Sequence, residues 1–103
     1  MGPLTLRCPR CRVAHRVTTV LDHCTLSWPN KGWLLFECPA CGNQDSHVEV
    51  EDGRLSTGVL DGAPGPAFMP EDSVEVEGLR HTVKPWAITL QIGKKTWRVK
   101  AKR

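Results

Sequence analysis

Two cysteine pairs with the same spacing are the strongest chemical feature of the sequence. Cys8 and Cys11 enclose a Pro-Arg spacer, Cys38 and Cys41 enclose a Pro-Ala spacer, and 26 residues separate the pairs. A two-residue spacer lets one tight turn bring both sulfur atoms to one ion, while backbone N–H groups of the turn face the thiolates. Two such turns complete a tetrahedral site. The spacing therefore predicts one structural Zn²⁺ bound by these four cysteines.

The residue that follows each pair differs. Gly42 follows the second pair and supplies the positive φ that this turn commonly needs. Arg12 stands at the equivalent place after the first pair, so it must accept a costlier backbone conformation or a different turn.

Two other chemistries use similar cysteine pairs. A redox-active CxxC of the thioredoxin type expects a βαβ context, which this sequence lacks. Rubredoxin-like iron uses similar turns, but Arg12 in place of glycine and the absence of any tyrosine argue against it. Zinc is preferred, and four thiolates would close its coordination sphere, leaving no position for a catalytic water. In small finger peptides, the apparent free energy of zinc binding is on the order of 10 to 16 kcal/mol, and it stabilises the folded state.

The remaining cysteine and the histidines carry weaker signals. Cys24 shares the strand parity of Leu26 and Trp28, which predicts a buried core residue. A ligand exchange that brings in Cys24, His23 or His15 remains open. No nucleophile, base and orienting group stand together, and no glycine-rich phosphate loop precedes a helix. We therefore expect no enzyme and no small-molecule substrate.

Basic and aromatic residues concentrate in two places. The C-terminal hairpin and the first cysteine turn together suggest nucleic-acid binding, through Arg10, Arg12, Arg16, Lys94, Lys95, Arg98 and Lys100. The alternative is that Trp86 and Trp97 both lie on an apolar face of the hairpin and pack in the core.

The net charge of +3 hides an uneven distribution. Residues 43–79 carry nine acidic side chains and one basic one, whereas residues 80–103 carry eight basic side chains and no acidic one. We expect either a charged partner or mutual neutralisation, with the acidic strand Val74 to Glu77 beside the basic hairpin.

The elements that must position these residues are predicted to be strands. Alternating β-branched, aromatic and polar residues between frequent turn signals predict an all-β chain with little or no helix. The expected strands are 4–7, 13–20, 24–28, 33–38, 47–51, 54–59, 74–77, 86–92 and 95–101. Turns at 29–32, 52–53 and 93–94 set the register. This register pairs Trp28 with Trp33, Leu26 with Leu35, Glu51 with Arg54, Val50 with Leu55, Leu90 with Trp97, Ile88 with Val99 and Trp86 with Ala101.

The two Cys-Pro-x-Cys turns resemble those of the zinc-ribbon class over residues 4–51. The resemblance implies zinc and a β-ribbon with one turn at the tip of each hairpin. The ending Phe36-Glu37-Cys38-Pro39-Ala40-Cys41-Gly42 is also similar to small zinc-ribbon proteins of unassigned role from bacteriophages and actinobacteria. Zinc ribbons serve many processes, so the fold does not name the function.

We expect three parts: a zinc ribbon with an extra hairpin (1–60), a Pro/Gly-rich arm (61–73) whose residues 61–70 join no strand ladder for long, and a small β-hairpin module with an acidic strand (74–103). The expected function is docking onto a larger protein assembly, such as a phage particle, through Phe68, Met69, Trp86 and Trp97. The alternative is a nucleic-acid-binding regulator or polymerase-associated factor. Without an apolar span or leader we expect a protein of the reducing cytoplasm that does not enter membranes.

Overall fold

Antiparallel strands make up most of the chain. The computed structural model describes residues 4–61, 64 and 67–101. In order, its elements are β1 (Thr5–Arg7), β2 (Ala14–Arg16), α1 (Val17–Asp22), β3 (Cys24–Trp28), the 3₁₀ turn η1 (Pro29–Lys31), β4 (Trp33–Phe36), β5 (Ser46–Glu51), β6 (Arg54–Asp61), β7 (Ala67–Glu75), β8 (Leu79–Lys84), β9 (Ala87–Ile92) and β10 (Lys95–Lys100). The all-β prediction is confirmed.

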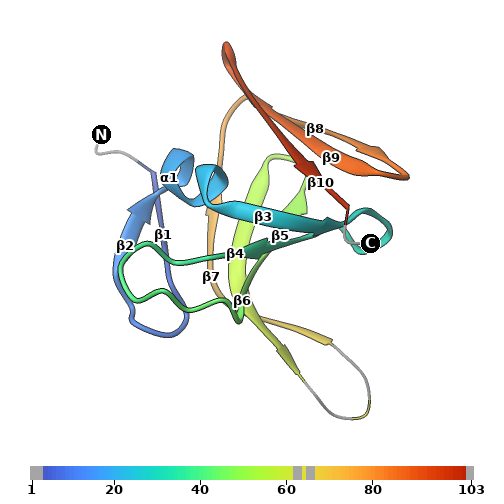
Figure 1. Ribbon diagram of the computed structural model, residues 1–103. Coiled ribbons are helices and arrows are strands. Elements are labelled where there is room, and N and C mark those ends of the chain that lie inside the picture. Colours follow the sequence, from blue (N-terminus) through green and yellow to red (C-terminus); the bar gives the residue numbers. More distant parts are fainter. Residues whose placement is uncertain (1–3, 62–63, 65–66, 102–103) are drawn as a thin grey trace.

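The strands form three sheets (Figure 1). β1 and β2 form a small hairpin, β3-β4-β5-β6-β7 form a five-stranded sheet, and β10-β9-β8 form a three-stranded sheet. The two larger sheets meet where β10 reaches β3, because Ser27 forms a parallel bridge with Ala101. The buried Ser27 hydroxyl also donates a 3.0 Å hydrogen bond to the Val99 carbonyl.

The hairpin registers are confirmed. Trp28 pairs with Trp33, Val50 with Leu55 and Leu90 with Trp97, and the other expected ladder pairs follow. The last expected pair is joined by a 2.7 Å hydrogen bond from the Ala101 N–H to the Trp86 carbonyl. These registers follow from local turn chemistry, since the glycine of each turn takes the left-handed conformation, with φ between 59° and 71°.

The expected strand at 13–20 is wrong over most of its length. Only Ala14–Arg16 are extended, and helix α1 follows directly. Its buried residues are Val17, Val20 and Leu21, which recur at the three- and four-residue spacing of a helix. The neighbouring β-branched residues made this spacing resemble a strand. Packing into the core outweighs the modest helix propensity of the valines and threonines in the segment.

The expectation that residues 61–70 join no ladder is also wrong. β7 begins at Ala67 and pairs with β6 down to the Arg54–Glu75 pair. Residues 62–63 and 65–66 lie outside the described residues. β7 is an edge strand, which accommodates Pro70, and a bulge next to Gly58 lets the two strands stay paired.

The acidic strand does not lie beside the basic hairpin. Val74 and Glu75 belong to β7 and pair with β6. The strand that pairs with β9 on the side away from β10 is β8, which the sequence pattern did not predict. One hydrophobic core connects the parts, since buried residues of β4, β5 and β6 form a single cluster with those of β9 and β10.

Candidate metal centre

Two hairpin tips bring the four cysteines together. The first turn joins β1 to β2 and the second joins β4 to β5, so each cysteine pair lies at the tip of a hairpin. The turns share one hydrogen-bond pattern: the Arg12 N–H donates to the Cys8 carbonyl at 2.9 Å, and the Gly42 N–H donates to the Cys38 carbonyl at 2.8 Å. Gly42 has a φ of 74° and Arg12 a φ of 66°. Arg12 therefore accepts the costlier conformation, which is one of the two alternatives expected from the sequence, and the first turn is not of a different type.

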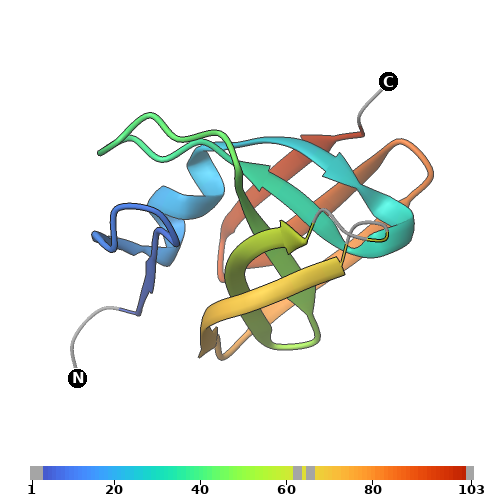
Figure 2. The same ribbon diagram turned by 90° about the horizontal axis from the view of Figure 1, so that it is seen from below.

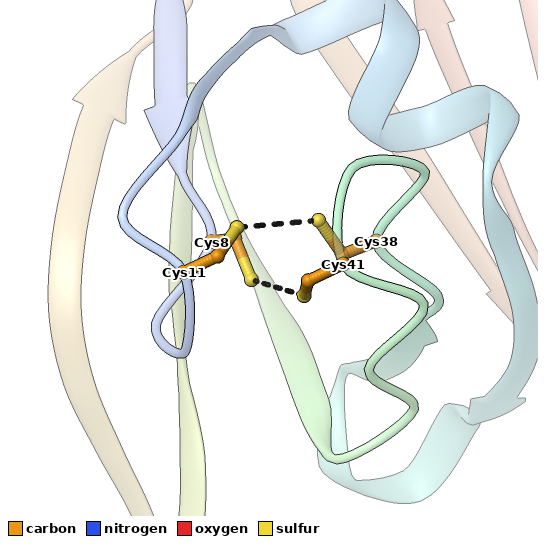
Figure 3. Close-up of side chains that lie close together, drawn as sticks. All are labelled: Cys8, Cys11, Cys38 and Cys41. Atoms are coloured by element: carbon orange, nitrogen blue, oxygen red, sulfur yellow. Dashed lines mark hydrogen bonds between the residues drawn. The ribbon is translucent and has the colours of Figure 1, made fainter.

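The sulfur geometry fits one zinc ion (Figure 3). The four Sγ atoms lie within 4.8 Å of one another, with 3.9 Å between Cys8 and Cys41 and 3.7 Å between Cys11 and Cys38. Zn–S bonds of about 2.3 Å in a tetrahedron place sulfurs about 3.8 Å apart. A disulfide needs only about 2.05 Å. The four cysteines thus form a zinc-ribbon-like site for one structural Zn²⁺.

Polar groups lie next to two of the sulfurs. The Arg10 N–H donates to the Cys8 sulfur at 3.4 Å, and the Ser46 hydroxyl lies 3.7 Å from the same atom. The Nε2 atom of His15 lies 3.3 Å from the Cys38 sulfur. His15 therefore contacts a ligand, and the four-sulfur group is complete without it. Sequence reasoning missed Ser46, whose only signal is its place at the start of a strand that leaves the second turn.

At this spacing, the four thiols cannot all lose their protons unless a positive charge lies among them. Burial raises the pKa of Cys38 to about 12, and the thiols of Cys41 and Cys8 raise it too, although backbone N–H groups oppose the shift. At Cys8 burial also acts to raise the pKa, but N–H groups of Cys11 and Arg10 bring it down to about 7. A divalent cation among the sulfurs would supply the charge that four thiolates need.

Cys24 and His23 lie apart from this group. The Cys24 thiol donates to the Val20 carbonyl at 3.2 Å, and burial, followed by the charge of Asp22, raises its pKa. His23 Nδ1 contacts the Thr19 carbonyl at 2.8 Å. Cys24 packs against the core as predicted but is half-buried, and a register shift between Cys24 and Leu26 breaks the shared strand parity on which the prediction rested. Neither Cys24 nor His23 belongs to the four-sulfur cluster.

The structure does not bring the two basic clusters together. The cysteine turns lie at one end of the molecule and the β8–β9 loop lies at the other (Figures 1 and 2). Near the turns, Arg10 lies 3.9 Å from Asp45 and Arg12 lies 3.4 Å from Glu71, while Arg16 is exposed. Lys95 contacts Asp22 at 3.8 Å, and Lys94 is exposed in its turn.

Acidic residues of β7 lie next to the first cysteine turn and the strands β1 and β6. Besides the Glu71 contact, Asp72 accepts a 2.9 Å hydrogen bond from the Arg7 N–H, and Glu75 lies 3.8 Å from Arg54. The expected mutual neutralisation of the acidic strand and the C-terminal hairpin is therefore wrong, because the acidic residues of β7 contact β1, the first cysteine turn and β6 instead.

The four residues expected at a docking surface differ in exposure. Trp97 is only 7% exposed and lies in the core, whereas Trp86 is 58% exposed and Met69 is 52% exposed. Phe68 is half-buried, with its ring 6.2 Å from that of Trp33. The expectation that both tryptophans of the hairpin pack inside holds for Trp97 and is wrong for Trp86, which stands in the β8–β9 loop.

The outer face of the three-stranded sheet is basic. Because Ile88, Leu90 and Val99 point into the core, the alternate positions of β8, β9 and β10 lie on the other side of the sheet, where all but Ala87 and the half-buried Thr89 are exposed. The charged residues at these positions are Arg80, Lys84, Arg98 and Lys100, and we call them the basic face. The three strands contain no aspartate or glutamate.

A groove lies beside this face, where β10 meets β3. It has a volume of about 790 Å³ and is lined by Thr25, Leu26, Pro85, Trp86, Arg98, Lys100 and Ala101. Two cations of the basic face and the most exposed of the large apolar side chains therefore share one concave surface.

In comparisons with known proteins, no family model, curated protein or solved structure matches the chain.

Proposed function

We propose that this chain is a non-enzymatic, zinc-stabilised protein that binds nucleic acid through the basic face. The observation that carries the proposal is a set of four exposed cations on β8 and β10, two strands that contain no acidic residue. Among the described residues, none of Arg80, Lys84, Arg98 and Lys100 takes part in an ion pair. Their field is therefore available to a polyanion, and phosphates are the partner that such a field attracts.

The metal centre supports a structural and not a catalytic role. Its four sulfurs fill a tetrahedral coordination sphere, so an ion held there keeps no position for substrate. The centre lies at the end of the molecule away from the β8–β9 loop (Figure 1). Zinc then holds two hairpin tips together while another surface binds.

Salt dependence tests the proposal. We would measure anisotropy of labelled random-sequence DNA and RNA with zinc-loaded protein, from low to physiological salt. Affinity should fall steeply with salt, and Arg80→Gln/Lys84→Gln should flatten the log–log slope by about 1 for each phosphate contact removed. Arg7→Gln/Arg54→Gln, which removes two exposed charges elsewhere, is the matched control and should leave the slope near that of the unmodified protein. No binding at low salt would contradict the proposal.

A second candidate is docking onto a protein assembly, for example as an accessory protein of a phage particle. The five-stranded sheet favours it, because Trp33 and Phe68 are half-buried on its outer side and Met69, on the opposite side of β7, is exposed. Co-sedimentation with assemblies purified from the source of the sequence, lost in Met69→Glu, would support this function. It would do so most clearly if nucleic acid fails to bind.

No described helix is long and apolar enough to span a bilayer.

A further inference from the structure

We propose that the groove between β3 and β10 is a subsite for single-stranded nucleic acid. In it an unpaired base stacks on Trp86, and neighbouring phosphates contact Arg98 and Lys100. This inference rests on the proposed function and deepens it, because it names the form of nucleic acid that the protein prefers.

Trp86 is presented to solvent by a constrained loop. The ladder of β8 and β9 ends at the Lys84–Ala87 pair, so Pro85 and Trp86 form the two-residue loop between them. Proline restricts the backbone on one side, and the Trp86 carbonyl accepts a 2.7 Å hydrogen bond from Ala101 on the other. The indole is 58% exposed although its backbone is held. Such a side chain can stack on a ligand at low entropic cost.

The lining of the groove combines the two chemistries that a single strand offers. Leu26, Pro85 and Trp86 supply apolar surface, and Arg98 and Lys100 supply positive charge, whereas none of the described residues that line the groove carries a carboxylate. Bases stack on aromatic rings irrespective of sequence, and phosphates follow basic grooves. The volume of about 790 Å³ falls in the range of pockets that hold small organic ligands, so one nucleotide fits.

The groove distinguishes single strands from duplexes, which the basic face alone does not. Arg98 and Lys100 belong to both the basic face and the groove. A nucleic-acid strand that crosses the basic face therefore stays in contact with cations until it reaches the groove. In a duplex the bases are stacked on one another, and their faces are closed to Trp86. A single strand can turn a base into the groove and gain the additional contact.

The test compares oligothymidylate with a duplex of equal length at one low salt concentration. We expect Trp86→Ala to weaken single-strand binding about 5- to 150-fold, the range measured for loss of one base–aromatic stack. Trp86→Phe should retain most of the affinity, and duplex affinity should not change in either variant. Binding of the single strand should also quench tryptophan fluorescence in the unmodified protein.

Met69→Ala is the matched control, because it shortens another exposed apolar side chain away from the groove. Zinc content and circular dichroism of every variant would verify folding. If Trp86→Ala binds single strands like the unmodified protein while Arg80→Gln/Lys84→Gln binds them weakly, the inference is overturned and the proposed function stands. Equal losses for single strand and duplex also overturn it. If neither nucleic acid binds at low salt, both fail and a protein partner is indicated.

Discussion

The indole N–H of Trp97 donates a 2.6 Å hydrogen bond to Asp22 Oδ1, between residues that are 75 positions apart. Asp22 ends helix α1, and its second oxygen lies 3.8 Å from Lys95 Nζ. One carboxylate thus joins the helix that follows the first cysteine hairpin to the last strand of the chain. The zinc-binding part and the C-terminal sheet are therefore fixed to each other by a specific contact as well as by shared apolar packing.

Removing this carboxylate should cost stability. We expect Asp22→Ala to lower the free energy of unfolding by about 1 to 3 kcal/mol, because the nearly buried indole N–H loses its acceptor. Urea unfolding in excess zinc, followed by circular dichroism, measures the change. Glu77→Ala, at an exposed position, should be within about 0.5 kcal/mol of the unmodified protein. Equal stability of both variants would show that the contact is dispensable.

The metal should be required for folding. Cys38→Ser removes a buried ligand, so we expect loss of zinc and loss of the cooperative unfolding transition, and a strong chelator should have the same effect on the unmodified protein. Native mass spectrometry counts the bound ion. Cys24→Ser is the matched control and should keep one zinc, because Cys24 lies outside the four-sulfur group. A stable, metal-free Cys38→Ser protein would refute the structural role.

The two residues after the cysteine pairs should respond in opposite directions. Gly42→Ala places a Cβ in open space at a φ of 74°, so its only cost is backbone strain of about 1 to 2 kcal/mol. Arg12→Gly relieves the same strain at a φ of 66° and should stabilise the protein, less the small contribution of the exposed contact with Glu71. Thermal unfolding in excess zinc compares them. A destabilised Arg12→Gly would mean that the arginine side chain holds the first turn.

Gly58 should tolerate no side chain. A Cβ at this position would lie 2.1 Å from the Met69 carbonyl oxygen and 3.0 Å from the Phe68 ring, so the backbone of β7 must move. Gly58→Ala should therefore lose about 1 to 3 kcal/mol. Hydrogen exchange of β7 amides should accelerate with it. Exchange that stays slow in β7 would contradict the tight approach of the two strands.

His47 predicts a pH dependence near neutrality. Burial lowers its pKa from the ordinary 6.5, although the Asp45 carbonyl, 2.9 Å from Nδ1, and the Asp45 charge act the other way. The unfolded chain then binds the proton more readily, so stability is full above about pH 6.5 and falls as the pH drops below it. Urea unfolding between pH 8 and 6 at saturating zinc checks the slope. His47→Gln should flatten it, and a slope unchanged by that substitution would assign it to other groups.

The cysteine site and the hairpin registers could be predicted because their determinants are local. A two-residue spacer brings two sulfurs together, and Gly32, Gly53 and Gly93 each allow a left-handed turn residue that fixes the pairing on either side. These features depend on a few neighbouring residues and do not need the rest of the fold.

The remaining features depend on distant parts of the chain. Helix α1 is short, and Val17 and Val20 lie among other β-branched residues, so the helical spacing becomes visible only when the buried residues are known. The pairing of β7 with β6 and of β8 with β9 has no local signal comparable to an Asp-Gly turn. The exposure of Trp86 follows from its place in a two-residue loop, whereas the alternation of a strand would have put it inside.

The bridge between Ser27 and Ala101 joins an early strand to the end of the described chain. On one side β3 pairs with β4, a local contact, but Ala101, which bridges to Ser27 on its other edge, comes more than 70 residues later. During synthesis the zinc hairpins can therefore form while β3 is still an open edge, able to pair with another chain. The bridge from Ala101 and the hydrogen bond from Ser27 to Val99 occupy part of this edge, so a chain that lacks its last residues should aggregate more readily even when the metal site is filled.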